Sequence, residues 1–336
     1  REDTNMKKNI YEELEKEIMN ADMKEENKKR LLKNVMKLKE QKINIMVTGA
    51  TGCGKSSTIN ALFDMEVAKV GVGVDPETMD IEKYELDNLV LWDTPGLGDG
   101  KERDARHAAN IIKKLTDVDG DGKALIDLVL VILDGSSRDL GTSYDLINNV
   151  IIPHLGENKE GRIIVAINQA DAAMKGRYWD EEKNEPQQKL KTFLDEKVVS
   201  VRNRVFEATG VRIDPIYYSA GFKEEGEKQA RPYNLSKLLY YIVKATPSEK
   251  RVVYANNVNQ TKSNWKDNDR NLNYGKEIKK SWVESVMEGA KEGAAIGEAI
   301  GESLFGPAGG KVLKGVGAAI GGAGRLVEGF FNSIFG

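Results

Sequence analysis

Hydrophobic positions follow three different patterns along the 336-residue chain. In residues 1–40, apolar side chains recur at helical intervals among charged ones, which predicts two amphipathic helices separated near residues 20–22. From residue 43 onward, short β-branched runs alternate with helical stretches. This alternation is typical of an α/β domain with a doubly wound, mostly parallel sheet. From residue 286 onward, Gly and Ala dominate the composition.

Five apolar runs bounded by turn residues are the expected buried strands. They are Ile43–Val47, Leu89–Trp92, Leu128–Leu133, Ile163–Ile167 and Ile213–Tyr218. A sixth run, Asp80–Leu86, alternates polar and apolar residues and predicts an antiparallel edge strand. We therefore divide the chain into an N-terminal helical segment, an α/β domain, a polar linker or helix, and a glycine-rich helical tail. These four parts span residues 1–42, 43–247, 248–285 and 286–336.

A glycine-rich loop follows the first expected strand. Residues 49–56 read Gly-Ala-Thr-Gly-Cys-Gly-Lys-Ser, the spacing of a phosphate-binding loop (P-loop) between a strand and a helix. Glycine lets successive N–H groups turn inward and form an anion nest at the helix N-terminus. Lys55 would contact the β- and γ-phosphates, and the Ser56 hydroxyl would coordinate Mg²⁺. The expected nucleotide-binding residues of this loop are Gly49, Ala50, Thr51, Gly52, Cys53, Gly54, Lys55, Ser56 and Ser57.

The strand Leu89–Trp92 leads into Asp93-Thr94-Pro95-Gly96. In a P-loop domain, a carboxylate at this strand end can bind Mg²⁺ through water, and the glycine N–H can reach the γ-phosphate. Thr78, in the preceding loop, is placed to close on the metal and the γ-phosphate. The expected catalytic residues are Lys55, Thr78, Thr94 and Gly96, and the expected metal ligands are Ser56, Thr78 and Asp93.

Two later loops predict which base the bound nucleotide carries. In Asn168-Gln169-Ala170-Asp171, the Asp171 carboxylate can accept hydrogen bonds from guanine N1–H and N2–H₂, whereas adenine has no matching donor pair. Asn168 would brace the loop. After the last expected strand, Ser219-Ala220 would place the Ala220 N–H at guanine O6. The sequence therefore predicts GTP or GDP with Mg²⁺ as the ligand.

The five motifs, in this order along residues 43–247, resemble those of the translation-factor class of GTPases, particularly the Era/septin-like group. Within that group the chain is similar to the bacterial YfjP-type GTPases. The similar features are a leading helical segment, an aromatic insert at residues 178–180 and an amphipathic tail with an aromatic end. The resemblance implies a molecular switch that hydrolyses GTP.

Three positions depart from the usual pattern of that group. Gln169 stands where a lysine usually covers the ribose, and its shorter stem covers it only in part. Leu97 stands where a glutamine would orient the attacking water, which implies slow or assisted hydrolysis. Gly52 stands where potassium-using Era-type proteins carry Asn. The loop is instead similar to that of septins and immunity-associated GTPases, which pair across the nucleotide, so the resemblance implies a nucleotide-dependent homodimer.

Composition narrows the remaining classes of site and partner. Cys53 is the single cysteine, so no intramolecular disulfide forms, and we expect a reducing, cytoplasmic compartment. Its thiol pKa would fall if helix N–H groups face it, but we favour a small filler residue. With only two histidines, a His-based zinc site or a Ser-His-Asp triad is not expected. A net charge of -3 argues against nucleic acid as a general partner, and hence against an Era-like role on ribosomes or RNA.

The tail carries glycine at every fourth position from Gly289 to Gly301, which makes a smooth strip on a helix. It lacks the roughly 18 uncharged apolar residues of a simple membrane span. Two interpretations remain open. The tail either docks on a membrane surface or self-associates, with its aromatic end as an anchor, or it folds back on the N-terminal helices. Correspondingly, the protein is either a GTPase switch or a nucleotide-regulated scaffold with negligible hydrolysis.

Overall fold

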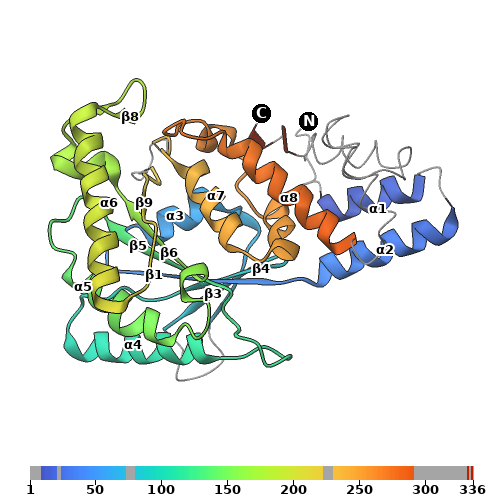
Figure 1. Cartoon of the computed structure of the whole chain (residues 1–336), viewed down its shortest axis with the longest axis horizontal. Coiled ribbons are helices and arrows are strands. Elements are labelled where there is room, and N and C mark those ends of the chain that lie inside the picture. Colours follow the sequence, from blue (N-terminus) through green and yellow to red (C-terminus); the bar gives the residue numbers. More distant parts are fainter. Residues whose placement is uncertain are drawn as a thin grey trace.

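A seven-stranded sheet forms the centre of the computed structural model, which describes residues 9–20, 24–72, 80–221, 230–290, 331, 332, 334 and 335 (Figure 1). The strand order is β2-β3-β4-β1-β5-β6-β9. All neighbouring pairs from β4 to β9 are parallel, whereas β3 is antiparallel to both of its neighbours. The predicted mostly parallel α/β sheet is therefore confirmed. The strands are β1 Ile43–Gly49, β2 Lys69–Val72, β3 Glu82–Leu86, β4 Leu89–Asp93, β5 Leu128–Asp134, β6 Ile163–Asn168 and β9 Ile216–Tyr217.

The two edges of the sheet differ from the prediction. The edge strand is β2 and not the run at residues 80–86, because β2 pairs with the outer side of β3. With four residues, one of them glycine, β2 is too short to show an alternating pattern. At the other edge, only Ile216 and Tyr217 pair with β6. Pro215 lacks the N–H that a longer ladder would need.

Helices cover both faces of the sheet (Figure 1). Along β5, Leu128, Leu130 and Ile132 enter one apolar core, and the residues between them enter the other. Because both faces are covered, the strand reads as a continuous apolar run. The first core is closed by α3 Lys55–Leu62, α7 Leu235–Ala245 and α8 Tyr274–Ala290. The second is closed by α4 Lys101–Thr116, α6 Gln188–Thr209, and α5 Gly141–Asp145 with the π-helical turn Leu146–Ile151.

The two predicted N-terminal helices are present as α1 Ile10–Asn20 and α2 Glu25–Glu40. Their apolar faces, which include Leu14 and Val35, are buried in the first core. Figure 1 shows the pair beside α8, against which α2 packs. The N–H of Ile10 donates a hydrogen bond to Asn256 Oδ1 at 2.8 Å, so the start of α1 is tied to a residue far along the chain.

Residues 248–285 pack more tightly than the expected polar linker. Val252, Val253 and Tyr254, in the 3₁₀-helical stretch Ser248–Asn256, are fully buried. The composition is misleading because several asparagines here are themselves buried and bonded to distant backbone. For example, Asn264 Nδ2 donates to Ala61 O at 3.2 Å. This segment belongs to the core that supports α3.

Most of the glycine-rich tail, Gly293 to Gly301 included, lies outside the described residues. Its last turn is described, and there Phe335 lies 5.4 Å from Trp265 and 6.0 Å from Trp282, between ring centroids. Ile334 is fully buried. The aromatic end therefore rests on α8 and the segment before it, which favours the fold-back interpretation.

Among the residues that the structure describes, no helix combines the length and the apolarity that crossing a bilayer requires.

Candidate functional site: a nucleotide pocket

The loop between β1 and α3 can be built only with glycine at two positions. Gly54 has a φ of +89°, and a Cβ there would lie 2.3 Å from Asn168 Nδ2. A Cβ on Gly49 would lie 2.4 Å from the carbonyl oxygen of Ile132. Both distances are far below van der Waals contact. The loop is thus pressed between β5 and the end of β6, in the conformation that a phosphate nest at the start of α3 needs.

Asp93 ends β4, directly beside the end of β1. Its Oδ1 is buried and has no hydrogen-bond partner among the described residues. Burial raises the pKa of this carboxyl to about 6, although the positive charge of Lys55 opposes the shift. A buried carboxylate oxygen without a partner suits a hard cation such as Mg²⁺.

Asp93 and the Ser56 hydroxyl, in the first turn of α3, would hold the ion. The ion would neutralise charge on the β- and γ-phosphate oxygens. The third predicted ligand, Thr78, lies outside the described residues.

We expect Asp93→Asn to stabilise the metal-free protein. The folded pKa of about 6 lies above the usual Asp value, so folding disfavours the ionised form. This cost is fully present above pH 6 and disappears as the pH falls toward 4. In EDTA at pH 7.5, the variant should gain about 1–2 kcal/mol in the free energy of unfolding, after allowance for partial solvent screening.

Denaturant titration measures this difference, and at pH 5 it should shrink because Asp93 is then mostly protonated. With Mg²⁺ and GDP added, the order should reverse, because the wild type binds the complex more tightly and gains more stability from it. A variant that is less stable than the wild type in EDTA at pH 7.5 would contradict this account of Asp93.

The guanine motif is held by three hydrogen bonds, two to the P-loop and one to the loop that carries Ala220. Asn168 Nδ2 donates to the Cys53 carbonyl at 3.1 Å, and Asn168 Oδ1 accepts from the Ala220 N–H at 3.0 Å. Gln169, with a left-handed φ of 60°, donates from Nε2 to the Gly52 carbonyl at 3.0 Å. One asparagine thus joins three loops, as its bracing role requires.

The Asp171 carboxylate makes no hydrogen bond or ion pair within the described part of the chain, so both of its oxygens are left for a ligand. Two other predicted residues already have partners within the protein. The Ala220 N–H, expected at guanine O6, donates to Asn168 instead, because a donor in a residue only 2% exposed needs an internal partner. Ser219 pairs through its backbone with Tyr233.

Cys53 is a filler residue, as favoured from the sequence. Its side chain is fully buried, and burial raises the thiol pKa to about 11. The alternative, a lowered thiol pKa, is wrong.

Comparison with known proteins agrees with this geometry. Residues 44–169, from β1 to the guanine motif, match the family model described as 50S ribosome-binding GTPase. The chain contains a P-loop GTPase domain. Guanine-nucleotide binding by this domain follows from the match together with the arrangement of the P-loop and the Asn168–Asp171 loop.

The GTPase domain has distant curated relatives in bacteria. The uncharacterized protein YfjP of Escherichia coli (strain K12) is 30% identical over 148 residues, which cover 43% of this chain and 47% of YfjP. YkfA of the same strain is 29% identical over 157 residues, which cover 46% of this chain and 50% of YkfA. The chain thus spans about half the length of these relatives. Interferon-inducible GTPase 1 of Mus musculus is 42% identical over 62 residues, covering 17% and 15%.

Solved structures resemble the GTPase domain more weakly. The G domain of the T. maritima FeoB iron transporter is 18% identical, covers 54% of this chain and 89% of its own, and has a TM-score of 0.29. Toc33 from Arabidopsis thaliana, solved with GDP and Mg²⁺, is 16% identical, covers 65% and 87%, and has a TM-score of 0.38. Likenesses at this level carry no inference about function.

The segment after Asp93 is fastened to the P-loop of the GTPase domain. A Cβ on Gly96 would lie 2.7 Å from the backbone nitrogen of Thr51, so the two backbones touch. Leu97 exchanges backbone hydrogen bonds with the loop: its N–H donates to Gly49 O at 3.4 Å, and its carbonyl accepts from the Thr51 N–H at 3.0 Å. Thr94, expected to be catalytic, is 2% exposed and donates its hydroxyl to Val47 O at 3.2 Å. In this structure its hydroxyl therefore fixes the position of the segment.

Sequence reasoning missed His107 on α4. This buried side chain lies with Nδ1 3.3 Å from the Gly96 carbonyl and with Nε2 3.9 Å from Asp80 Oδ2. It therefore joins α4, the Gly96 segment of the GTPase domain and the turn before β3. A histidine on a helix with no motif around it carries no sequence signal for this role.

Proposed function

We propose that the protein is a guanine-nucleotide switch that hydrolyses GTP slowly to GDP and phosphate, with Mg²⁺. The observation that carries the proposal is the environment of Leu97. This residue is 6% exposed, it has no group that can orient water, and its backbone is bonded to the P-loop. The names of the mouse relatives, both called GTPases, support hydrolysis as the reaction.

The bond between Thr51 and Leu97 offers a physical basis for switching. P-loop N–H groups are the donors that hold phosphate, and the Thr51 N–H donates to Leu97 O. The Thr51 hydroxyl also donates to Asp99 Oδ1 at 3.1 Å. A γ-phosphate that recruits the Gly96 N–H must rearrange this contact, and loss of the phosphate restores it.

Single-turnover GTP hydrolysis by Leu97→Gln tests the proposal. The wild type should turn over at about 10⁻⁴ to 10⁻² s⁻¹, as GTPases do without an activating partner. Leu97→Gln should raise this rate about tenfold, because the new amide can orient water. Leu97→Ala is the matched control, since it also loses the buried leucine but provides no amide, and its rate should not rise. Equal rates for the two variants would contradict the role given to this position.

We further propose that two copies pair across their nucleotides and that pairing accelerates hydrolysis. The support is the form of the P-loop, with Gly52 and the exposed Thr51 at its tip. The rate constant should then rise with protein concentration in GTP, together with a shift to dimer in light scattering. A rate constant that does not depend on concentration would exclude assistance by a second copy.

The second candidate function is a nucleotide-regulated scaffold on membranes. The observation that bears on it is the contact between Phe335 and Trp282, because an aromatic end that anchors in lipid must first leave α8. Liposome sedimentation in GDP and in a non-hydrolysable GTP analogue distinguishes the two. If the protein sediments with liposomes in a nucleotide-dependent way but does not hydrolyse GTP, the scaffold function would replace the switch function. The matched family model is named for ribosome binding, but the net charge of -3 gives that role no support.

A further inference from the structure

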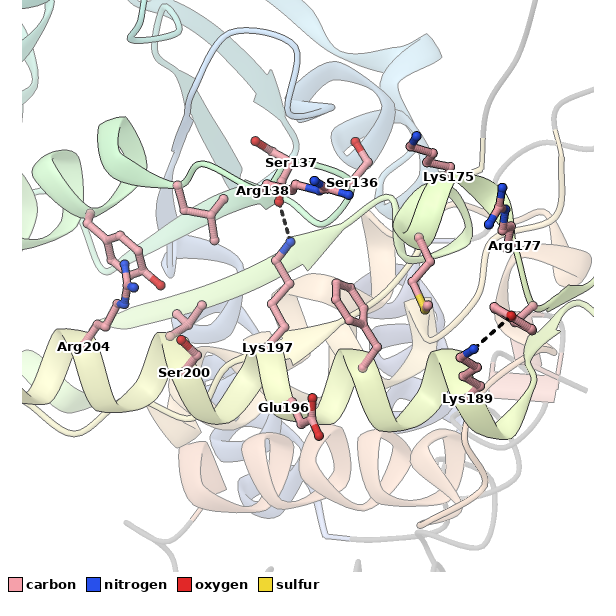
Figure 2. A pocket seen from close by; sticks show the side chains of 16 residues that line it. Ser136, Ser137, Arg138, Lys175, Arg177, Lys189, Glu196, Lys197, Ser200 and Arg204 are labelled. Atoms are coloured by element: carbon pink, nitrogen blue, oxygen red, sulfur yellow. Dashed lines mark hydrogen bonds between the residues drawn. The ribbon is translucent and has the colours of Figure 1, made fainter.

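A second pocket lies beside the guanine motif, between α6 and the loop that follows β5 (Figure 2). Its volume is about 730 Å³, within the range of small-molecule sites. Its apolar and aromatic lining includes Leu140, Met174 and Phe193. None of the residues that we assign to the nucleotide lines it.

The charges around this pocket are almost all positive. Six cationic side chains line it, and Glu196 is the only carboxylate that does. Figure 2 shows Arg204 at one end, Arg177 at the other and Lys197 between them. The cations are Arg138, Lys175, Arg177, Lys189, Lys197 and Arg204.

Three of these cations have no partner to neutralise them. The side chains of Arg138, Lys175 and Arg177 make no hydrogen bond or ion pair with any residue in the described part of the chain. Lys197, by contrast, is held in place, because its Nζ donates to the carbonyls of Gly135 at 2.8 Å and Ser137 at 2.7 Å. Six positive charges that gather in one hollow with a single carboxylate create a field that favours an anionic ligand.

The backbone that carries two of these cations is strained. Met174, Lys175 and Tyr178 have φ values of 52°, 62° and 66°, in the left-handed region that residues with a Cβ rarely adopt. Such conformations persist where the surrounding structure holds them, and they concentrate at functional sites. Here they lie in the segment that carries Lys175 and Arg177, both of which are exposed and line the pocket.

We infer that this pocket binds a ligand carrying two or more phosphate groups. We also infer that the bound ligand changes the rate at which the guanine nucleotide is released. A single monoanion cannot neutralise cations spread over both ends of the pocket, whereas a polyphosphorylated one can. The connection to the nucleotide runs through Ser136, which lines the pocket. Its hydroxyl is shared between Asp134 Oδ1 at 2.6 Å and Gln169 Oε1 at 3.3 Å, and Gln169 in turn donates to the P-loop at Gly52.

Binding is tested on the full chain saturated with GDP and Mg²⁺, so that the P-loop is not available to the probe. Inositol hexakisphosphate is the soluble probe, and phosphatidylcholine vesicles with or without cardiolipin are the lipid probe. We expect micromolar binding to one of them, and the one that binds identifies the source of the phosphates. Failure of both probes to bind would overturn the inference.

The double variant Arg138→Gln/Arg177→Gln should weaken this binding at least tenfold. Its matched control is Arg103→Gln/Lys123→Gln, which removes the same charge from exposed positions outside the pocket and should bind as the wild type does. Equal weakening in both would show attraction to net charge alone and overturn the assigned pocket. Circular dichroism and unchanged GDP affinity establish that the variants are folded.

Coupling is read from the rate of GDP release, which depends on nucleotide binding and not on hydrolysis. The bound probe should change this rate at least threefold in the wild type. In Ser136→Ala the probe should still bind but no longer change the rate. An unaltered effect of the probe in Ser136→Ala would exclude the proposed connection.

Discussion

Lys55→Ala should lower the affinity for GDP and GTP at least 100-fold, about 3 kcal/mol. Lys55 is the first residue of α3, its ammonium makes no bond or ion pair within the described part of the chain, and its charge opposes the shift of the Asp93 pKa. These facts place a free positive charge at the mouth of the P-loop. Truncation of the side chain removes that charge from the phosphates. The backbone N–H groups cannot replace it, because they carry only partial charges.

Titration calorimetry with GDP and Mg²⁺ measures the loss. Lys42→Ala is a suitable control, because it removes an equal charge from an exposed position just before β1 and should leave affinity unchanged. The melting temperature without nucleotide should stay near that of the wild type, since Lys55 makes no structural contact that we observe. Wild-type affinity in Lys55→Ala would remove the basis for assigning a phosphate site here.

Asp171→Asn should exchange guanine for xanthine as the preferred base. An aspartate accepts from both N1–H and N2–H₂ of guanine, whereas an asparagine turns a donor toward N2. Xanthine carries a carbonyl oxygen at that position and can accept from it. Because unpaired buried donors are costly, we expect GDP affinity to fall at least 100-fold, about 3 kcal/mol, while XDP affinity rises.

Competition between GDP and XDP for a fluorescent nucleotide measures the preference directly. Asp145→Asn makes the same chemical change at an exposed position on α5 and should keep the preference for GDP. If Asp171→Asn still prefers GDP, another residue recognises the base.

The elements that the sequence predicts best are those in which local pattern and ligand chemistry coincide. The P-loop is an example: Gly49 and Gly54 are required by close contacts with Ile132 and Asn168, and the run before them forms β1 as expected. The guanine motif is another, because Asn168 reaches the P-loop wherever β6 lies beside β5 and β5 beside β1. In both cases a motif of a few neighbouring residues carries the sequence signal, although the contacts that it makes are distant in sequence.

The features that escaped prediction depend on residues distant in sequence. Thr94 is predicted to be catalytic, but its hydroxyl donates to the carbonyl of Val47. The position of His107 matters only because the folded chain brings it to the Gly96 carbonyl. The segment after residue 248 looked polar, because nothing local shows that Asn264 is bonded to Ala61. The cationic pocket is assembled from segments on either side of the guanine motif, and no short motif encodes it.

The hydrogen bond from Ile10 to Asn256 has a consequence for the order in which the chain matures. At a synthesis rate of about 5–20 residues per second, α1 leaves the ribosome roughly 10–50 s before its partner exists. The sheet around the P-loop can form in that interval, because its strands are complete by residue 217. The N-terminal hairpin should therefore dock last, with its apolar face open to chaperones until the segment near residue 256 emerges.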